Sequence, residues 1–180
     1  MSTALKGLKP EFKIPALDPK WAQFARKRQA TLTKPEGSLG QLEKLAIQLA
    51  SIQGTPTPSV RPAHVLIFAS DHPVAARGVS AFPQEVTFAM VTNMLTGGAA
   101  SSVLAQHHQI PMHIIDVGVI SPHPSRKQGP VTLRRITEAV DGNVADLAAA
   151  KAMDPATFAA CVQAGIESVD AVGTSQLMIL

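Results

Sequence analysis

Continuous apolar runs of strand length alternate with amphipathic stretches from residue 63 onward. Three of these runs predict buried strands of a parallel sheet, at 63–70, 111–119 and 175–180. A strand that is covered on both faces has apolar residues at successive positions and not only at every second one. Apolar positions at helical spacing lie between them, at 84–95, 99–108 and 154–169. Residues 120–143 are predicted as loop, with some strand character at 131–136. This order predicts an α/β fold with a parallel sheet and flanking helices.

Two further helices are predicted ahead of the sheet. Residues 18–31 open with Asp18, a favoured N-cap residue, and Pro19, which suits the first helical position. A second helix is predicted from about Ser38 to Ile52. We therefore expect an N-terminal arm and helical lobe, a linker, and the N-terminal part of a parallel α/β domain, at 1–53, 54–62 and 63–180.

Composition narrows the class of protein. The 180 residues are 46% hydrophobic and 16% charged, which is typical of a folded domain with its own core. No nucleic-acid partner is expected, because the net charge is only +3 and the chain has few aromatic residues on which bases could stack: six Phe, one Trp and no Tyr. No apolar run has the length of a signal peptide or a membrane span, so no membrane association is expected. Cys161 is the only cysteine, so no intrachain disulfide can form and a cytoplasmic location is expected.

Polar residues stand at the carboxyl ends of two predicted strands. Asp71 and His72 follow the first strand, and Asp116 and Gly118 lie at the end of the second. Ligands of open parallel sheets bind beyond these ends, so all four positions are candidates for a binding site. A structural alternative stays open, in which Asp71 caps the following turn and His72 packs under the loop.

A stripe of large apolar residues is predicted along the next helix. Phe82, Val86 and Met90 are four residues apart, so they share one face. They could wall a flat slot for an aromatic ligand, to which Met offers a soft contact. The same spacing is also that of an ordinary core, and spacing alone leaves both interpretations open.

Two other motifs carry weaker signals. The segment KPEGSLG at 34–40 has two glycines and a lysine before a helix, which could cradle a phosphate. It lacks the spacing of a P-loop, and Ser38 is explained equally well as a helix N-cap. None of the six histidines lies at metal-site spacing from a cysteine or carboxylate, so no metal site is expected.

Four segments resemble, in order, the nicotinate-nucleotide:dimethylbenzimidazole phosphoribosyltransferases, the CobT family. Segment 34–50 resembles the family's Lys-Pro-x-Gly-Ser-Leu-Gly-x-Leu-Glu motif, and 70–100 its Asp-His-Gly-Val…Gly-Val-Ser…Pro-x-x-Val-Thr…Gly-Gly-Ala motif. Segment 114–119 matches the second-strand motif, and 152–167 is similar to a later helix. Several blocks in the same order across nearly the whole chain are far more specific than one short motif.

The resemblance implies a reaction of cobalamin lower-ligand synthesis. A benzimidazole nitrogen attacks the anomeric carbon of nicotinate mononucleotide, nicotinate leaves, and α-ribazole phosphate forms with inversion. It implies a Rossmann-like parallel sheet with a small domain, a homodimer, and no metal or cofactor. Expected substrate-binding residues are Phe82 and Met90, at positions that line the base, with Val86, Ser80, Asp71 and His72.

Two residues depart from the family pattern beside this expected site. Pro73 stands where the family usually has glycine, and proline fixes φ and removes an N–H. The loop would be altered if the family needs that N–H or a positive φ. Arg77 replaces what is often an acidic residue, which would change the charge at the rim of the pocket.

The resemblance also predicts that the chain is truncated. After the third strand the family continues with Gly-Glu-Met-Gly-Ile-Gly-Asn-Thr-Thr, which helps to hold the nucleotide, and its general-base glutamate lies further on. Neither follows 175–180, so no catalytic residue is expected here and the chain alone should be inactive. It would be a fragment, a truncated product or a subunit that associates with a C-terminal half. The alternatives are a non-catalytic module that binds a benzimidazole or a partner, and an inert fragment.

Overall fold

The computed structural model describes residues 15–120, 126–128, 131–135, 145–173 and 177–179. The chain divides into two compact units, with the boundary between Arg61 and Pro62. The first unit is helical and the second contains the sheet. Most of the predicted N-terminal arm, at 1–17, and much of the predicted loop at 120–143 lie outside the described residues.

The helical unit consists of α1 (Pro19–Ala30) and α2 (Gln41–Gln53). Helix α1 begins as predicted, because the Asp18 carboxylate accepts a hydrogen bond from the Lys20 N–H at 3.0 Å and proline occupies the first turn. The expectation that Ser38 caps the second helix is wrong. Gly40 is the N-cap, and Ser38 lies in the turn before it.

A hydrogen-bonded ion pair fixes the entry to α2. Lys34 Nζ lies 2.6 Å from Glu43 Oε1, and both side chains are only 14% exposed. The same carboxylate oxygen accepts the Leu39 N–H at 3.2 Å. The Lys34 ammonium, followed by the Leu39 N–H, lowers the pKa of Glu43. Two donors that a phosphate would need are thus already bound, so this geometry favours a structural role for the KPEGSLG segment.

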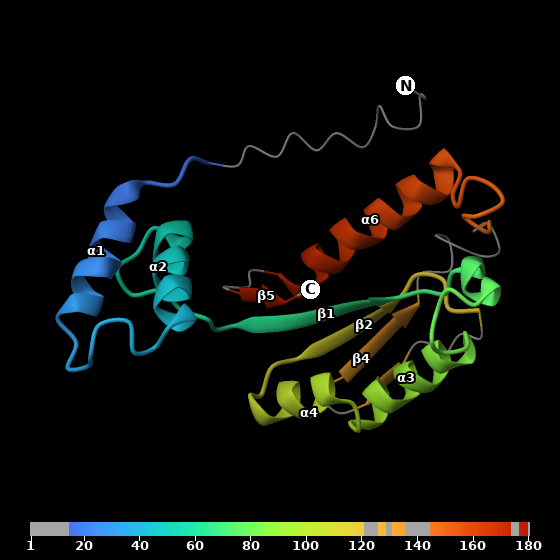
Figure 1. The fold of residues 1–180 in the computed structure, drawn as a ribbon, viewed down its shortest axis with the longest axis horizontal. Coiled ribbons are helices and arrows are strands. Elements are labelled where there is room, and N and C mark those ends of the chain that lie inside the picture. The colour runs from blue at the N-terminus through green and yellow to red at the C-terminus, as the bar shows by residue number, and fades with distance from the viewer. Residues whose placement is uncertain (1–14, 121–125, 129–130, 136–144, 174–176, 180) are drawn as a thin grey trace. The chain divides into compact units, whose positions relative to one another are not determined.

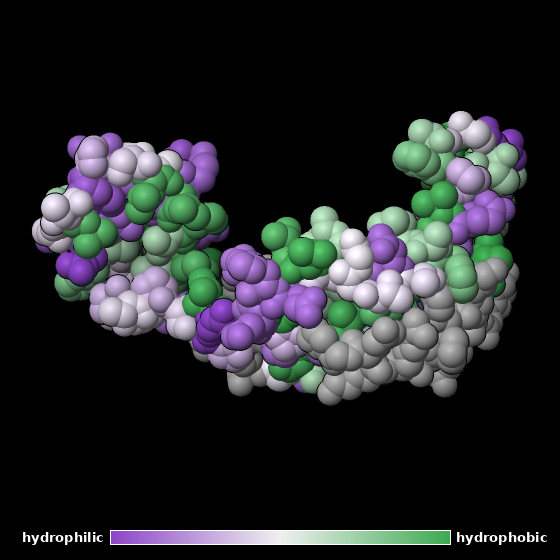
Figure 2. Space-filling view, turned by 90° about the horizontal axis from the view of Figure 1, so that it is seen from below, coloured by the Kyte–Doolittle hydropathy of each residue, from purple (hydrophilic) through white to green (hydrophobic). Residues whose placement is uncertain are grey.

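The helical unit has a small core and an apolar surface. Ala25 and Ala50 are its buried apolar residues within the described part of the unit. Several large side chains are at least half exposed: Leu17, Phe24, Leu42, Leu45 and Ile52. Figure 2 shows this unit at the left, with hydrophobic patches beside polar ones. Little of the unit's apolar surface is therefore removed from water by its own two helices.

The second unit is built on a five-stranded sheet in the order β3-β4-β2-β1-β5 (Figure 1). All neighbouring strands are parallel except the β3–β4 pair at one edge. The predicted parallel α/β fold is confirmed, and each predicted strand is present. The strands are β1 (Ala63–Ala69), β2 (Met112–Asp116), β3 (Arg126–Gln128), β4 (Val131–Arg135) and β5 (Leu177–Ile179).

The strand character predicted at 131–136 is confirmed as β4, which pairs with β2 along its whole length, whereas the expectation of loop is wrong at β3. Val131 and Leu133 are buried in the main core, whereas Thr132 and Arg134 lie on the opposite face. The alternation of buried and exposed positions in β4 extends over only five residues. Arginine near the end of so short a segment is also typical of a surface loop. Tertiary contacts on both faces are what hold this segment as a strand.

Helices α3 (Glu85–Thr96) and α4 (Ala100–His107) cover one face of the sheet (Figure 1). The core beneath them joins Val91 and Leu95 of α3 to Met112 and Ile114 of β2, with Leu133 of β4. Helix α3 begins and ends one residue later than the predicted range of 84–95, and Gly97 is its C-cap. The φ of +85° at Gly97 is a left-handed conformation that glycine adopts without strain.

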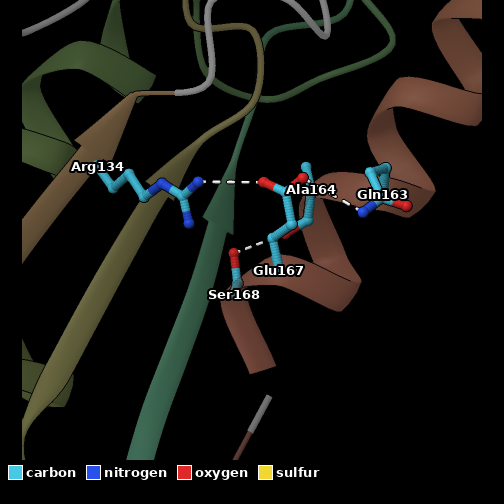
Figure 3. Close-up of polar contacts among 5 residues, drawn as sticks. All are labelled: Arg134, Gln163, Ala164, Glu167 and Ser168. Atoms are coloured by element: carbon cyan, nitrogen blue, oxygen red, sulfur yellow. Dashed lines mark hydrogen bonds and ion pairs between the residues drawn. The ribbon is translucent and has the colours of Figure 1, made fainter. Parts of the chain in front are cut away.

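Helix α6 (Pro155–Val172) covers the opposite face of the sheet. It begins as predicted, with Asp154 accepting the Thr157 N–H at 2.7 Å. Arg134 of β4 donates to Glu167 of α6 at 3.1 Å, and Gln163 donates to the same carboxylate (Figure 3). This ion pair is half exposed, so it orients α6 more than it stabilises the fold.

One stretch of the second unit has the length and composition of a membrane span. Residues Glu85–His107 reach a mean hydropathy of 1.2. The backbone breaks at Gly97, however, and gives helices of 12 and 8 residues. Each is shorter than the ~20 residues that cross a bilayer, and both contribute residues to the core against the sheet.

Two histidines form a pair on the α6 face of the sheet. His64 Nδ1 of β1 lies 3.0 Å from His113 Nε2 of β2, and the rings are stacked with centroids 5.3 Å apart. Burial, and then the neighbouring His64, lower the pKa of His113 below its ordinary value of 6.5. The hydrogen bond requires one of the two facing nitrogens to be without a proton.

This pair predicts a pH dependence of stability. The folded state holds His113 neutral, so below pH 6.5 the unfolded chain takes up a proton that the folded chain resists, and stability falls. We expect the midpoint temperature of unfolding, followed by circular dichroism, to drop less between pH 7 and pH 5 for His113→Gln than for the wild type. The exposed His107→Gln is the control, and equal slopes for His113→Gln and wild type would contradict the prediction.

Candidate functional site

The carboxyl ends of β1 and β2 meet at one edge of the sheet, because the parallel register pairs Ala69 with Asp116. The backbone contact continues beyond both strands. The Val117 N–H donates to the Ala69 carbonyl at 2.9 Å, and the Asp71 N–H donates to the Gly118 carbonyl at 3.0 Å. The segments that follow the strands are therefore tied to each other.

Two buried carboxylates hold the loop after β2. Asp116 Oδ1 accepts the N–H groups of Gly118 and Val119, at 3.0 and 2.9 Å. Asp71 Oδ2 accepts the Ile120 N–H at 2.9 Å. Asp116 is 2% exposed and Asp71 is 7% exposed. Asp116 is thus explained by its structural role. The alternative that Asp71 caps its own following turn is wrong, since its carboxylate reaches the other loop.

The loop after β1 turns through a short 3₁₀ helix, η2 (Pro73–Arg77). Pro73 occupies the first turn, where its fixed φ is suitable and its missing N–H is not required. The departure at Pro73 is therefore accommodated. Arg77 forms an ion pair with Asp146, whose pKa is lowered by the Ala148 N–H and then by Arg77. The charge that Arg77 adds is paired.

A cavity of about 440 Å³ opens between the end of β1, the η2 loop and α3. All six residues that the sequence analysis assigned to substrate binding line it: Ser80, Phe82, Val86, Met90, Asp71 and His72. Ile67, Thr87 and Met94 add to the wall. Most of this lining is apolar, and polar groups come from the segments at the strand end. The fold thus brings these six predicted residues together around one cavity.

Exposure separates the cavity wall from the core of the same helix. Phe82 is 69% exposed and Met90 is 42% exposed, whereas Val91 and Leu95 are each 2% exposed. Phe82 and Met90 are therefore not core residues, which was the alternative that spacing left open. Phe82 precedes α3 instead of opening it, and its N–H donates to Ser80 Oγ at 3.2 Å.

The polar side of the cavity is formed near the end of β1. His72 is exposed and lies 3.2 Å from Ser70 Oγ through Nε2, so the expectation that it packs under the loop is wrong. Over the described ranges, no three histidine, cysteine or acidic side chains come together as a metal site. An apolar wall with an exposed aromatic ring and a few polar groups suits a flat heterocyclic ligand.

A second cavity, of about 490 Å³, adjoins the first and was not anticipated from the sequence. Its lining in the described part of the chain is Asp71, Gln84, Glu85, Phe88 and Ile120. Asp71 and Gln84 line both cavities. The spacing of Gln84 and Phe88, four residues apart, could have indicated a second face of the helix. Nothing in the sequence distinguishes that face from an ordinary solvated one.

Comparison with known proteins reveals relatives along most of the chain. The sequence model of a family described as phosphoribosyltransferase matches residues 14–180. A nicotinate-nucleotide–dimethylbenzimidazole phosphoribosyltransferase from Pseudomonas syringae pv. syringae (strain B728a) is 44% identical over 162 residues, which are 88% of this chain and 44% of that protein. A protein of the same name from Pseudomonas fluorescens (strain SBW25) is 53% identical over 107 residues, 59% of this chain and 30% of that protein.

Solved structures show the same likeness. The crystal structure of nicotinate-nucleotide-dimethylbenzimidazole phosphoribosyltransferase from Thermus thermophilus matches with a TM-score of 0.70 and 38% sequence identity. The match covers 88% of this chain and 47% of that chain. The chain therefore spans less than half the length of each of these relatives.

The contact between Asp71 and Ile120 predicts different effects of two substitutions. Asp71→Ala leaves the Ile120 N–H without its acceptor, which should cost about 1–3 kcal/mol of unfolding free energy. Asp71→Asn retains an oxygen for that N–H and should lose much less. Urea unfolding followed by circular dichroism measures both variants. Equal losses for the two would show that the hydrogen bond to Ile120 does not stabilise the loop.

Proposed function

The chain belongs to the phosphoribosyltransferase family, and from that premise we propose that it supplies the base-binding half of a phosphoribosyl transfer. In the proposed reaction, a benzimidazole ring nitrogen attacks the anomeric carbon of nicotinate mononucleotide. The bond from that carbon to the nicotinate nitrogen breaks, and its electron pair leaves with nicotinate. The second benzimidazole nitrogen loses its proton to a base, and α-ribazole phosphate forms with inversion.

The observation that carries this proposal is the apolar cavity between the carboxyl end of β1, the η2 loop and α3. Phe82 and Met90 expose large apolar surfaces at its wall, where most residues of that size would be buried. A benzimidazole is flat and mainly apolar, so a phenyl ring and a thioether can both contact its face. A cavity of about 440 Å³ has ample room for such a ligand.

Each lining residue has a role in this proposal. Phe82 and Met90 contact the faces of the base, and Val86 lies between them on the same wall. Ser80, Asp71 and His72 supply polar contacts at the strand end. No residue of this chain is assigned the role of general base.

The proposed partner is the complementary C-terminal half of the transferase, because the chain spans only 44% of a relative that it matches over most of its own length. That partner would carry the glycine-rich segment and the general-base glutamate implied by the resemblance. Positioning the nucleotide and removing the proton are both large contributions to such a transfer. Association of two copies of this chain is the other assembly that the resemblance implies.

A non-catalytic role is the second candidate function. The observation that favours it is that all six residues assigned to base binding line one cavity of this chain. A chain of this kind could bind a benzimidazole and release it unchanged. The two candidates differ in whether product forms when a complementary half is present.

The conversion assay decides between them. Purified chain is mixed with nicotinate mononucleotide and dimethylbenzimidazole, with and without the C-terminal half of the Pseudomonas syringae relative, and α-ribazole phosphate is followed by chromatography. Product with both halves supports the proposal. Product from this chain alone would overturn the requirement for a partner. Binding of dimethylbenzimidazole without product in either mixture favours the non-catalytic role.

Binding measurements test the residues assigned to the base. Phe82→Ala and Met90→Ala should each weaken dimethylbenzimidazole binding roughly tenfold, equivalent to ~1.4 kcal/mol, through the loss of face contacts. Isothermal titration calorimetry on the isolated chain measures the affinities. Phe158→Ala removes a similarly exposed phenylalanine of α6 and should leave binding unchanged. If Phe82→Ala and Phe158→Ala bind dimethylbenzimidazole with equal affinity, the assignment of Phe82 to the base-binding site is wrong.

A further inference from the structure

Part of the wall of the apolar cavity comes from a surface segment, residues 72–82, that has few anchors in the fold. Its contribution to the lining is His72, Ala75, Ser80 and Phe82. Residues 76–82 are all exposed, so no buried side chain holds this part of the segment. Within the described part of the chain, the hydrogen bonds of segment 72–82 are to residues 70–82, except for one that Arg77 makes.

This exception is an ion pair between distant parts of the chain. Arg77 Nε donates to Asp146 Oδ2, 69 residues further along. We propose that the Arg77–Asp146 pair positions segment 72–82 beside the cavity and thereby raises the affinity for the base. The inference rests on the proposed function, because the ligand concerned is the base. Neither side chain is part of the cavity lining, so both are positioning residues that act through the segment.

Asp146 is an oriented partner for Arg77. Its Oδ1 accepts the Ala148 N–H at 2.9 Å, and its carbonyl accepts the N–H groups of Ala149 and Ala150, both at 2.9 Å. The Ala148 N–H, and then Arg77, lower the pKa of Asp146, so its carboxylate stays charged at neutral pH. Because one carboxylate oxygen is already bound within this turn, the ion pair orders mainly the arginine side chain.

Arg77 is well placed to transmit this anchoring to the cavity wall. It is the last residue of η2, and Gly78 follows it in a left-handed conformation with a φ of +75°. Beyond this turn, the Phe82 N–H donates to Ser80 Oγ at 3.2 Å, a contact that lies within the segment itself. Only four residues separate Arg77 from Phe82, so release of Arg77 lets the phenyl ring move away from the base. Binding must then order the segment at a cost in affinity.

The exposure of the pair determines the expected size of the effect. The side chains of Arg77 and Asp146 are 51% and 25% exposed. Ion pairs at the surface contribute little, so we expect their loss to weaken base binding only about threefold. The effect should also depend on salt, which screens exposed charges.

Calorimetric titration with dimethylbenzimidazole tests the pair. Arg77→Met removes the charge, and Asp146→Asn keeps an oxygen for the Ala148 N–H. Each should weaken binding about threefold at low salt, and the double variant should bind no more weakly than either single one. Arg77→Lys, which keeps the charge, should lose less. The difference between wild type and Arg77→Met should narrow at about 1 M salt.

A second ion pair supplies the matched control. Arg134 and Glu167 form a pair of similar exposure, and neither residue lines the apolar cavity. Arg134→Met should therefore keep the wild-type affinity for dimethylbenzimidazole. Circular dichroism verifies that every variant is folded and gives its midpoint temperature of unfolding. We expect Arg77→Met to unfold close to the wild-type temperature, which separates positioning of the segment from a general loss of stability.

The outcomes separate this inference from the proposed function. Binding of dimethylbenzimidazole with equal affinity by wild type and Arg77→Met would overturn the positioning role and leave the base cavity standing. Additive losses in the double variant would also overturn it, since the two residues would then act independently.

If the wild-type chain binds no dimethylbenzimidazole, the proposed function fails and limited proteolysis tests the positioning of the segment directly. Trypsin cleaves after arginine, so release of Arg77 in Asp146→Asn should speed cleavage between Arg77 and Gly78 severalfold, as measured by mass spectrometry. Cleavage at the wild-type rate would overturn the inference.

Discussion

The parallel pairing of β1 with β2 is the constraint on which the candidate site depends. Because Ala69 lies opposite Asp116, both strands end at the same edge of the sheet. The segments beyond them are then joined by backbone contacts and by the Asp71 carboxylate. The polar side of the cavity is therefore held by the sheet itself, before any ligand is present. In a preformed site of this kind, little of the binding free energy is lost in ordering the residues that line it.

Capping residues and apolar runs made much of the fold predictable. Asp18 and Asp154, each followed by proline, mark the starts of α1 and α6 through a local hydrogen bond that the sequence alone encodes. Strand β4 was harder to predict, because its stability depends on partners far away in the chain. Arg134 finds Glu167 on α6, a contact across 33 residues that no local pattern reports.

The candidate site shows a different limit of prediction. Spacing correctly put Val86 and Met90 on one face of a helix, but the same spacing describes a core and a cavity wall. Only the fold shows that Val91 and Leu95 are the buried face and that Met90 is not. Nothing in the sequence distinguished Gln84, whose buried amide nitrogen has no partner among the described residues, from a solvated residue, because an unpaired amide is a property of its surroundings and not of its residue type.

The modest core of the helical unit has a consequence for how the chain unfolds. Ala25 and Ala50 bury little apolar area, and all residues of the larger core beneath α3 belong to the other unit. Trp21, the only tryptophan in the sequence, lies in α1 beside Phe24, with ring centroids 5.9 Å apart. Tryptophan fluorescence thus reports on the helices of the first unit, while circular dichroism averages both units. Coincidence of the two unfolding transitions is therefore the test of whether the whole chain unfolds in a single two-state step.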